Sequence, residues 1–294
     1  MLPFCRDAMT AATECDIMLT APGLTLGRHP IGPREFPTST EVGFRPKQAD
    51  YCVCVFVINE NGKLHKQLVS MQEHCAGVVD VVVADGGSTD GSTGPAKLRS
   101  LGVHTLLTKT GPGKLGAQMR MAFAWALDRG YKGVICMDGN GKDGPDAIPR
   151  FVQKLDEGYD HVQGSRFIRG GVSENLPLSR WVGVRFLHAP LVSLASRFRY
   201  TDTTNGFRGY SRRFLEDPRV SVFRDVFPGY ELHYYLAIRA ARLGYRVCEI
   251  PVSRRYPAHG PIPTKISPIR GNLRVLKCLF AACLGRYNPA NMGL

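Results

Sequence analysis

Hydrophobic positions along the chain alternate between short, continuous apolar runs and longer segments with helical spacing. The run from Cys52 to Ile58 is apolar throughout and indicates a strand buried on both faces. Similar runs cover residues 78–84, 103–107, 133–137 and 161–164. Between the runs, residues up to about 74, 115–128 and 145–155 predict helices. This order predicts an α/β fold in which helices flank a Rossmann-like, mostly parallel sheet.

The pattern changes after Gly171. Residues 178–199 and 230–243 predict helices, residues 207–210 and 245–250 predict short strands, and an amphipathic helix ends near Leu284. The first 49 residues are rich in turn formers, so we expect them to wrap around the core or to be partly mobile. We therefore divide the chain into residues 1–49, 50–171 and 172–294.

Composition and charge narrow the class of protein. The chain has 294 residues, 44% of them hydrophobic, and a formal net charge of +13. This composition argues against general disorder, and the charge suits nucleic acid, an anionic membrane or a phosphate-bearing substrate. The basic residues are spread singly, which argues against nucleic acid. Nine scattered cysteines and the lack of an apolar run of about 20 residues predict a reduced, cytoplasmic protein.

Two turns that follow predicted strands carry candidate chemistry. Asp85 precedes the glycine-rich stretch 86–92, and we expect its carboxylate to bind a ligand, because ligands lie at the carboxyl ends of parallel strands. We interpret Asp90 in the same stretch as a helix N-cap. Asp138 follows another strand and lies beside Gly139. A carboxylate placed there can hold a divalent cation, although a capped turn would explain it equally well.

Taken together, these turns resemble glycosyltransferase family 2 with the GT-A fold, and most closely its polyprenol-phosphate (dolichol-phosphate) mannosyltransferases. The resemblance covers residues 51–276. The matching segments are Asn59-Glu60, Asp85 with Ser88–Ser92, Pro112–Gly116, Asp138-Gly139-Asn140, Gly164–Phe167 with Gly170-Gly171, Thr204–Arg208, Gly229–Glu231 and Thr264–Ser267.

The resemblance implies inverting transfer of a sugar from a nucleoside diphosphate sugar, such as GDP-mannose, to a polyprenyl phosphate. Residues 50–171 would form the nucleotide-sugar-binding half of the GT-A domain, and residues 172–294 the acceptor side. The implied donor-binding residues are Asn59, Glu60, Asp85, Lys114, Asp138, Gly139 and Asn140. The implied acceptor- or phosphate-binding residues are Arg166, Arg180, Lys265 and one or both of Arg254 and Arg255. The expected catalytic residues are Asp138, Arg166 and Glu231.

The chain departs from the family pattern in its implied metal site. The expected ligands of Mg²⁺ or Mn²⁺ are Asp138 and Asn140, but the family usually has an aspartate where Asn140 stands. Lys142 stands where a neutral ligand is common, and Gly86 replaces a common aspartate. We expect a weak metal requirement, in which Lys142 either points away from the metal or supplies part of its charge. The base of the donor stays open.

Two other functions are compatible with these residues. The acceptor could be a hydroxyl group, which needs a general base, and Glu231 or Asp202 are the candidates. A non-catalytic protein that binds nucleotide sugars is the alternative from another class. A lipid acceptor also implies peripheral contact with the cytoplasmic face of a membrane.

Overall fold

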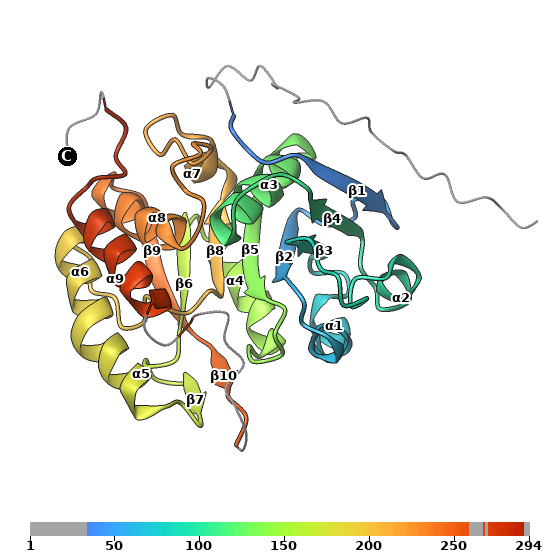
Figure 1. Ribbon diagram of the computed structural model, residues 1–294, viewed down its shortest axis with the longest axis horizontal. Helices are drawn as coiled ribbons and strands as arrows, with labels where there is room; N and C mark the ends of the chain where they lie inside the picture. Colours follow the sequence, from blue (N-terminus) through green and yellow to red (C-terminus); the bar gives the residue numbers. More distant parts are fainter. Residues whose placement is uncertain (1–33, 259–266, 268–269, 291–294) are drawn as a thin grey trace, which may run out of the picture.

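The computed structural model describes residues 34–258, 267 and 270–290. These residues form an eight-stranded sheet, in which the strands lie in the order β1-β4-β3-β2-β5-β8-β6-β9 (Figure 1). Its strands are β1 (Ser39–Gly43), β2 (Tyr51–Val57), β3 (Asp80–Asp85), β4 (Thr105–Lys109), β5 (Gly133–Asp138), β6 (His161–Ser165), β8 (Arg208–Ser211) and β9 (Val247–Pro251). The sheet therefore includes strands from both of the predicted halves.

The centre of the sheet is parallel, as the alternation predicts. β2 pairs in parallel with both β3 and β5, and β3 pairs in parallel with β4. All seven residues of β2 are buried, because helices cover both faces of the sheet. β8 runs antiparallel to its neighbours β5 and β6, whereas β9 is parallel to β6. The expectation of a mostly parallel sheet flanked by helices is confirmed.

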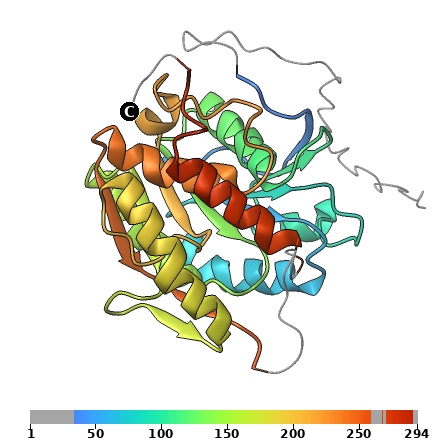
Figure 2. The ribbon, with the colours of Figure 1, turned by 60° about the vertical axis from the view of Figure 1, so that its left-hand side comes forward.

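Helices pack on both faces of the sheet and form separate hydrophobic clusters. The helices are α1 (Gly62–Cys75), α2 (Pro95–Ser100), α3 (Leu115–Asp128), α4 (Ile148–Asp156), α5 (Leu178–Gly183), α6 (Ala189–Ser196), α7 (Arg212–Glu216), α8 (Glu231–Arg242) and α9 (Arg270–Cys283). α3, α7 and α8 share one cluster with the sheet, while α1, α2 and α4 share the other. A third cluster joins α6, α8 and α9. This third cluster places α9 beside α6 and α8 (Figure 2).

The predicted helix over residues 178–199 forms with a local change of geometry. A π-helical turn, Val184–His188, joins α5 to α6. The helix stops at Arg197, which adopts a left-handed backbone with φ 61°. Residues 178–196 thus form one long helical segment, slightly shorter than the periodicity predicts.

The hydrophobic pattern of the sequence did not predict some of the elements. β1 lies within the predicted extension and pairs antiparallel with β4. A small second sheet pairs β7 (Val172–Glu174) in parallel with β10 (Ser253–Arg255). α2 begins at Pro95, so the interpretation of Asp90 as its N-cap is wrong; Asp90 instead accepts hydrogen bonds from the amide and hydroxyl of Ser92. In the described ranges, no helix combines the length and the apolar character that crossing a membrane requires.

Candidate active site

The turns after β2 and β3 are tied to each other at the carboxyl edge of the sheet. Asp85 ends β3, is 1% exposed, and accepts hydrogen bonds from the backbone N–H groups of Gly87 and Ser88 and from the Ser88 hydroxyl. Asn59 donates its N–H to the Ser88 hydroxyl, and its Oδ1 accepts the N–H of Thr89 at 2.8 Å. The carboxylate of Asp85 therefore shapes the turn in which the sequence predicts donor binding.

Two residues hold the strand ends close together. The amide Nε2 of Gln118, on α3, donates to the carbonyl oxygens of Val57 and Ala84. Val57 is the last residue of β2, and Ala84 is the last but one of the adjacent β3. A side chain at Gly139 would place its Cβ 2.3 Å from Cγ1 of Val57, so only glycine fits there. Sequence reasoning missed Gln118, because α3 is buried on nearly every side and a single buried glutamine leaves no periodic signal.

The turn after β5 holds a buried ion cluster centred on Arg254. The Arg254 guanidinium lies 2.9 Å from Oδ2 of Asp138 and 2.6 and 2.7 Å from the two carboxylate oxygens of Asp143. The Asp143 side chain is fully buried, whereas that of Asp138 is 29% exposed. Asn140 links the turn, since its Nδ2 donates to Asp138 and its Oδ1 accepts the N–H of Lys142.

The charges of this cluster act on its neighbours. Burial opposes ionisation of Asp138, but the charge and hydrogen bond of Arg254 outweigh it, so the pKa of Asp138 is lowered. Burial, and next the charge of Arg254, lower the pKa of Lys142 to about 8. The carboxylates of Asp138 and Asp143 oppose this shift, and an incoming anion would act in the same direction and favour the charged lysine.

Four cationic side chains surround Tyr256. Nζ of Lys142 lies 5.4 Å from the centre of its ring, and the guanidinium carbons of Arg180 and Arg254 lie 5.8 and 5.9 Å from it. Nη1 of Arg166 donates to the Tyr256 hydroxyl at 3.0 Å. Chain segments distant in sequence therefore bring guanidinium and ammonium groups to one point, an arrangement that suits phosphate oxygens. Tyr256 is absent from the residues that the sequence singles out.

Arg166 is held in place by a buried carboxylate. Its Nε lies 2.6 Å from Oδ2 of Asp202 and its Nη2 3.0 Å from Oδ1, while Thr204 accepts a further bond from Nη2. Burial opposes the charge of Asp202, but the charge and hydrogen bonds of Arg166 prevail and lower its pKa. Because Asp202 is ionised and paired, it is a poor general base.

The other predicted residues lie at different places. Glu231 begins α8; its Oε2 accepts the N–H of Gly229 at 2.5 Å, and its Oε1 lies 3.3 Å from the sulfur of Cys278. Lys114 is exposed immediately before α3. Arg255 points away from the cluster and pairs with Glu174 at the surface. Glu60 is buried after β2, and Lys265 lies outside the described residues.

A buried arginine lies beneath the site. Arg208, on β8, donates to the backbone carbonyl oxygens of Thr203, Asn205 and His233 and is 1% exposed. Gly206, in the same loop, lies against the Asp138 carboxylate, because a Cβ there would come within 3.1 Å of Oδ1. Arg208 therefore fixes the loop on which Asp138 rests.

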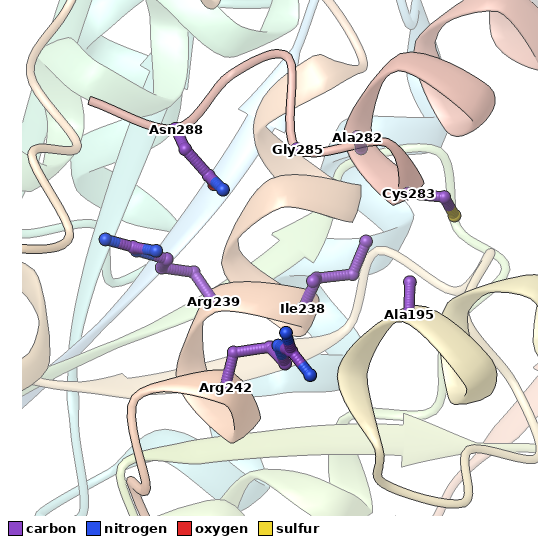
Figure 3. Close-up of a pocket in the computed structure, with 8 residues that line it drawn as sticks. All are labelled: Ala195, Ile238, Arg239, Arg242, Ala282, Cys283, Gly285 and Asn288. Atoms are coloured by element: carbon purple, nitrogen blue, oxygen red, sulfur yellow. The ribbon is translucent and has the colours of Figure 1, made fainter. Parts of the chain in front are cut away.

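A small hollow between α6, α8 and the end of α9 lies apart from this site (Figure 3). Arg242 and Cys283 are among the residues that line it. Arg242 ends α8 and Glu231 begins it, and these ends are about 16 Å apart at 1.5 Å per residue. We therefore assign the candidate site to the strand ends and not to this hollow.

Comparisons with known proteins define the fold and the family. Glucosyl-3-phosphoglycerate synthase from Mycobacterium tuberculosis, solved with Mn²⁺ and UDP-glucose, superposes with a TM-score of 0.56 at 20% identity, over 83% of this chain and 82% of that one. The fold is that of the GT-A glycosyltransferases. The profile of "Glycosyl transferase family 2" matches residues 52–218. The chain belongs to this family and is a glycosyltransferase, so the non-catalytic alternative no longer applies.

Curated relatives act on lipid phosphates according to their names. Polyprenol monophosphomannose synthase of Mycolicibacterium smegmatis is 31% identical over 63% of this chain and 70% of its own length. Undecaprenyl-phosphate mannosyltransferase of Micrococcus luteus is 33% identical over 59% of this chain and 71% of its own length. Dolichyl-phosphate hexose transferase of Haloferax volcanii is 28% identical over 80% of this chain and 94% of its own length.

The residues after β5 suit a metal ion only if a substrate supplies further ligands. Asp138 offers one partly exposed carboxylate and Asn140 one amide oxygen, while Arg254 occupies both oxygens of Asp143. Within the described ranges, no three His, Cys, Asp or Glu side chains are grouped so as to hold a metal. Proteins commonly hold Mg²⁺ with one or two carboxylates plus substrate phosphates. These residues therefore suit a divalent ion that arrives with a diphosphate.

Proposed function

We propose that the protein is an inverting hexosyltransferase that moves a sugar from a nucleoside diphosphate sugar to the phosphate of a polyprenyl phosphate. GDP-mannose is the first donor to test, because two of the curated relatives carry mannose in their names. The observation that carries the proposal is the convergence of four cations on Tyr256 beside Asp138. They face three carboxylates, those of Asp138, Asp143 and Asp202, so the cluster has an excess of one positive charge when Lys142 is charged.

The proposed reaction is a single displacement. An oxygen of the acceptor phosphate forms a bond to the anomeric carbon while the bond from that carbon to the β-phosphate oxygen breaks. The electron pair leaves with the nucleoside diphosphate, and the anomeric configuration inverts. The residues contribute by positioning the reactants and by stabilising the charge of the leaving group.

Each group of residues has a part in this proposal. Asn59, Glu60 and Asp85 would form the nucleoside side of the site, beside the turn that Asp85 holds. Lys142 and Arg254 would face the leaving diphosphate, and Arg166 and Arg180 the acceptor phosphate. A divalent ion held by Asp138 and Asn140 together with the diphosphate would supply further positive charge.

The state of the candidate bases favours a phosphate acceptor over a hydroxyl acceptor. Glu231 is engaged with the N–H of Gly229 and lies against Cys278, while Asp202 is paired with Arg166. A phosphate oxygen is already anionic at neutral pH and needs no base.

We further propose that the reaction takes place at the cytoplasmic face of a membrane, in agreement with the free thiols of the seven described cysteines.

Transfer to a soluble short-chain polyprenyl phosphate tests the proposal. The assay pairs this acceptor and a panel of hydroxyl acceptors with several nucleoside diphosphate sugars. We expect product from the lipid phosphate, with inverted configuration and at least a tenfold loss for Arg180→Ala. Arg255→Ala is the matched control, since this arginine pairs with Glu174 at the surface. Product from hydroxyl acceptors alone would contradict the proposal.

A further inference from the structure

A row of exposed apolar side chains runs along residues 178–196. Leu178, Val182, Phe186, Pro190 and Leu194 follow at intervals of four residues, and all are exposed. We call these five residues the apolar ridge. Leu178, Phe186 and Leu194 are 73%, 69% and 80% exposed. Residues four apart lie on the same side of a helix, and contiguous exposed apolar surface marks an interaction site.

The chain segment that carries the apolar ridge has charges of one sign. Residues 175–201 contain four arginines, Arg180, Arg185, Arg197 and Arg199, and no acidic residue. The chain after Glu249 likewise contains no acidic residue, and it contains five lysines and arginines besides Arg254 and Arg255, which pair with carboxylates. Apolar and basic side chains without carboxylates match the headgroup region of an anionic bilayer, where each basic residue adds about 1 kcal/mol of attraction.

α9 continues this surface. It shares a hydrophobic cluster with α6, and both helices lie on the side of the molecule that faces the viewer in Figure 2. Leu273 and Phe280 of α9 are 60% and 46% exposed, with the exposed Lys277 between them, and Leu284, directly after the helix, is 67% exposed. Two amphipathic helices of the same character therefore lie next to each other.

The apolar ridge begins at the candidate acceptor site. Arg180 is two residues from Leu178, and its guanidinium carbon lies 5.8 Å from the Tyr256 ring centre. The chain of a polyprenyl phosphate stays in the bilayer, so its phosphate can reach Arg180 only if this end of the helix lies at the membrane surface. The position of the ridge thus agrees with the acceptor that we propose.

We propose that the apolar ridge docks the enzyme on the surface of a bilayer that contains anionic lipids. The orientation of the enzyme on the bilayer rests on the proposed function. The choice of this surface rests on the exposure and charge of its side chains. A second copy of the chain fits less well, because a twofold contact would bring the same arginines against each other. Trp181, which is 39% exposed next to the ridge and packs edge-on against Phe186, would lie at the bilayer interface.

Vesicle binding tests the proposal without any catalytic step. The full chain is mixed with vesicles of phosphatidylcholine and phosphatidylglycerol at 7:3, or of phosphatidylcholine alone, and cosedimentation is measured. We expect binding to the anionic vesicles, at least tenfold weaker binding to the neutral ones, and release by 0.5 M salt. Leu178→Ser/Val182→Ser/Phe186→Ser should lower the affinity at least tenfold, whereas the matched control Val69→Ser, an exposed valine on α1, should not.

A second measurement locates the contact. Brominated acyl chains quench tryptophans that lie at the bilayer, so they should quench the native chain but not Trp181→Phe. Equal binding by the triple variant and the native chain, or a native dimer that the triple variant abolishes, would overturn the proposal. Transfer to the soluble short-chain acceptor should be unchanged in the triple variant. Loss of transfer in every arm, with vesicle binding intact, would instead contradict the proposed function.

Discussion

Replacing Arg166 should show how much its buried ion pair with Asp202 contributes to the stability of the fold. Arg166→Ala leaves the Asp202 carboxylate, whose side chain is 0% exposed, without its cation. Leaving one partner of a buried ion pair uncompensated costs about 3–5 kcal/mol. An unfolding entropy of about 2.1 cal/mol/K for each of 294 residues gives roughly 0.6 kcal/mol/K. The melting temperature should therefore fall by about 5–8 °C in a thermal scan.

Two controls separate stability from catalysis in this test. Arg255→Ala breaks an exposed pair with Glu174 and should change the melting temperature by less than about 2 °C. Arg166→Met/Asp202→Leu removes both charges and should restore most of the lost stability. We expect the double variant still to lose about tenfold or more in transfer, because it lacks the guanidinium that we propose faces the acceptor phosphate. A drop below 2 °C for Arg166→Ala would refute this reasoning.

Further predictions concern the donor side, packing, pH and metal. Asp85→Ala should weaken the calorimetric affinity for the best nucleoside diphosphate by about 10- to 150-fold, as expected for loss of a charged hydrogen-bond acceptor. Gly116→Ala should lower the free energy of unfolding by about 1–3 kcal/mol in a urea titration, because its Cβ would lie 2.4 Å from a carbonyl oxygen, while Gly183→Ala, with open space, should not. The lowered pKa of Asp202 means that its stabilisation is present at neutral pH and is lost as the pH falls below about 4, which acid unfolding monitored by circular dichroism can follow. Lys142→Gln should tighten Mn²⁺ binding in the presence of nucleoside diphosphate, measured by calorimetry, and full native activity in excess chelator would show that no metal is needed.

The hydrophobic pattern was sufficient to predict the parallel centre of the sheet and the turn that carries Asp138. It also predicted the strand over residues 207–210, which is β8, but not that β8 runs antiparallel, because a short antiparallel strand and a short parallel strand have the same apolar pattern. The choice between Arg254 and Arg255 also needed the structure. Neighbouring residues of a strand point to opposite faces, and only the pairing of β10 with β7 shows which face meets Asp138.

Contacts between distant segments explain the remaining gaps. Tyr256 becomes the centre of four cations only because the segments that contain Lys142, Arg166, Arg180 and Arg254 meet in space. Asp202 has the residue type of a general base, and its pairing with Arg166 is what removes that role. Residue type and spacing identify the edge of the sheet where chemistry occurs, while orientation and pairing decide which groups are available.

Burial and the charge of Arg208 together disfavour protonation of two histidines near Arg208. Burial, followed by the charge of Arg208, lowers the pKa of His161 and of His233 to about 3. Both imidazoles are therefore expected to be neutral near neutral pH. A phosphate monoester has a second pKa of about 6. The acid limb of a pH–rate profile would then report the ionisation of the acceptor itself and not that of these histidines, whereas Lys142, with a pKa of about 8, would act on the alkaline limb.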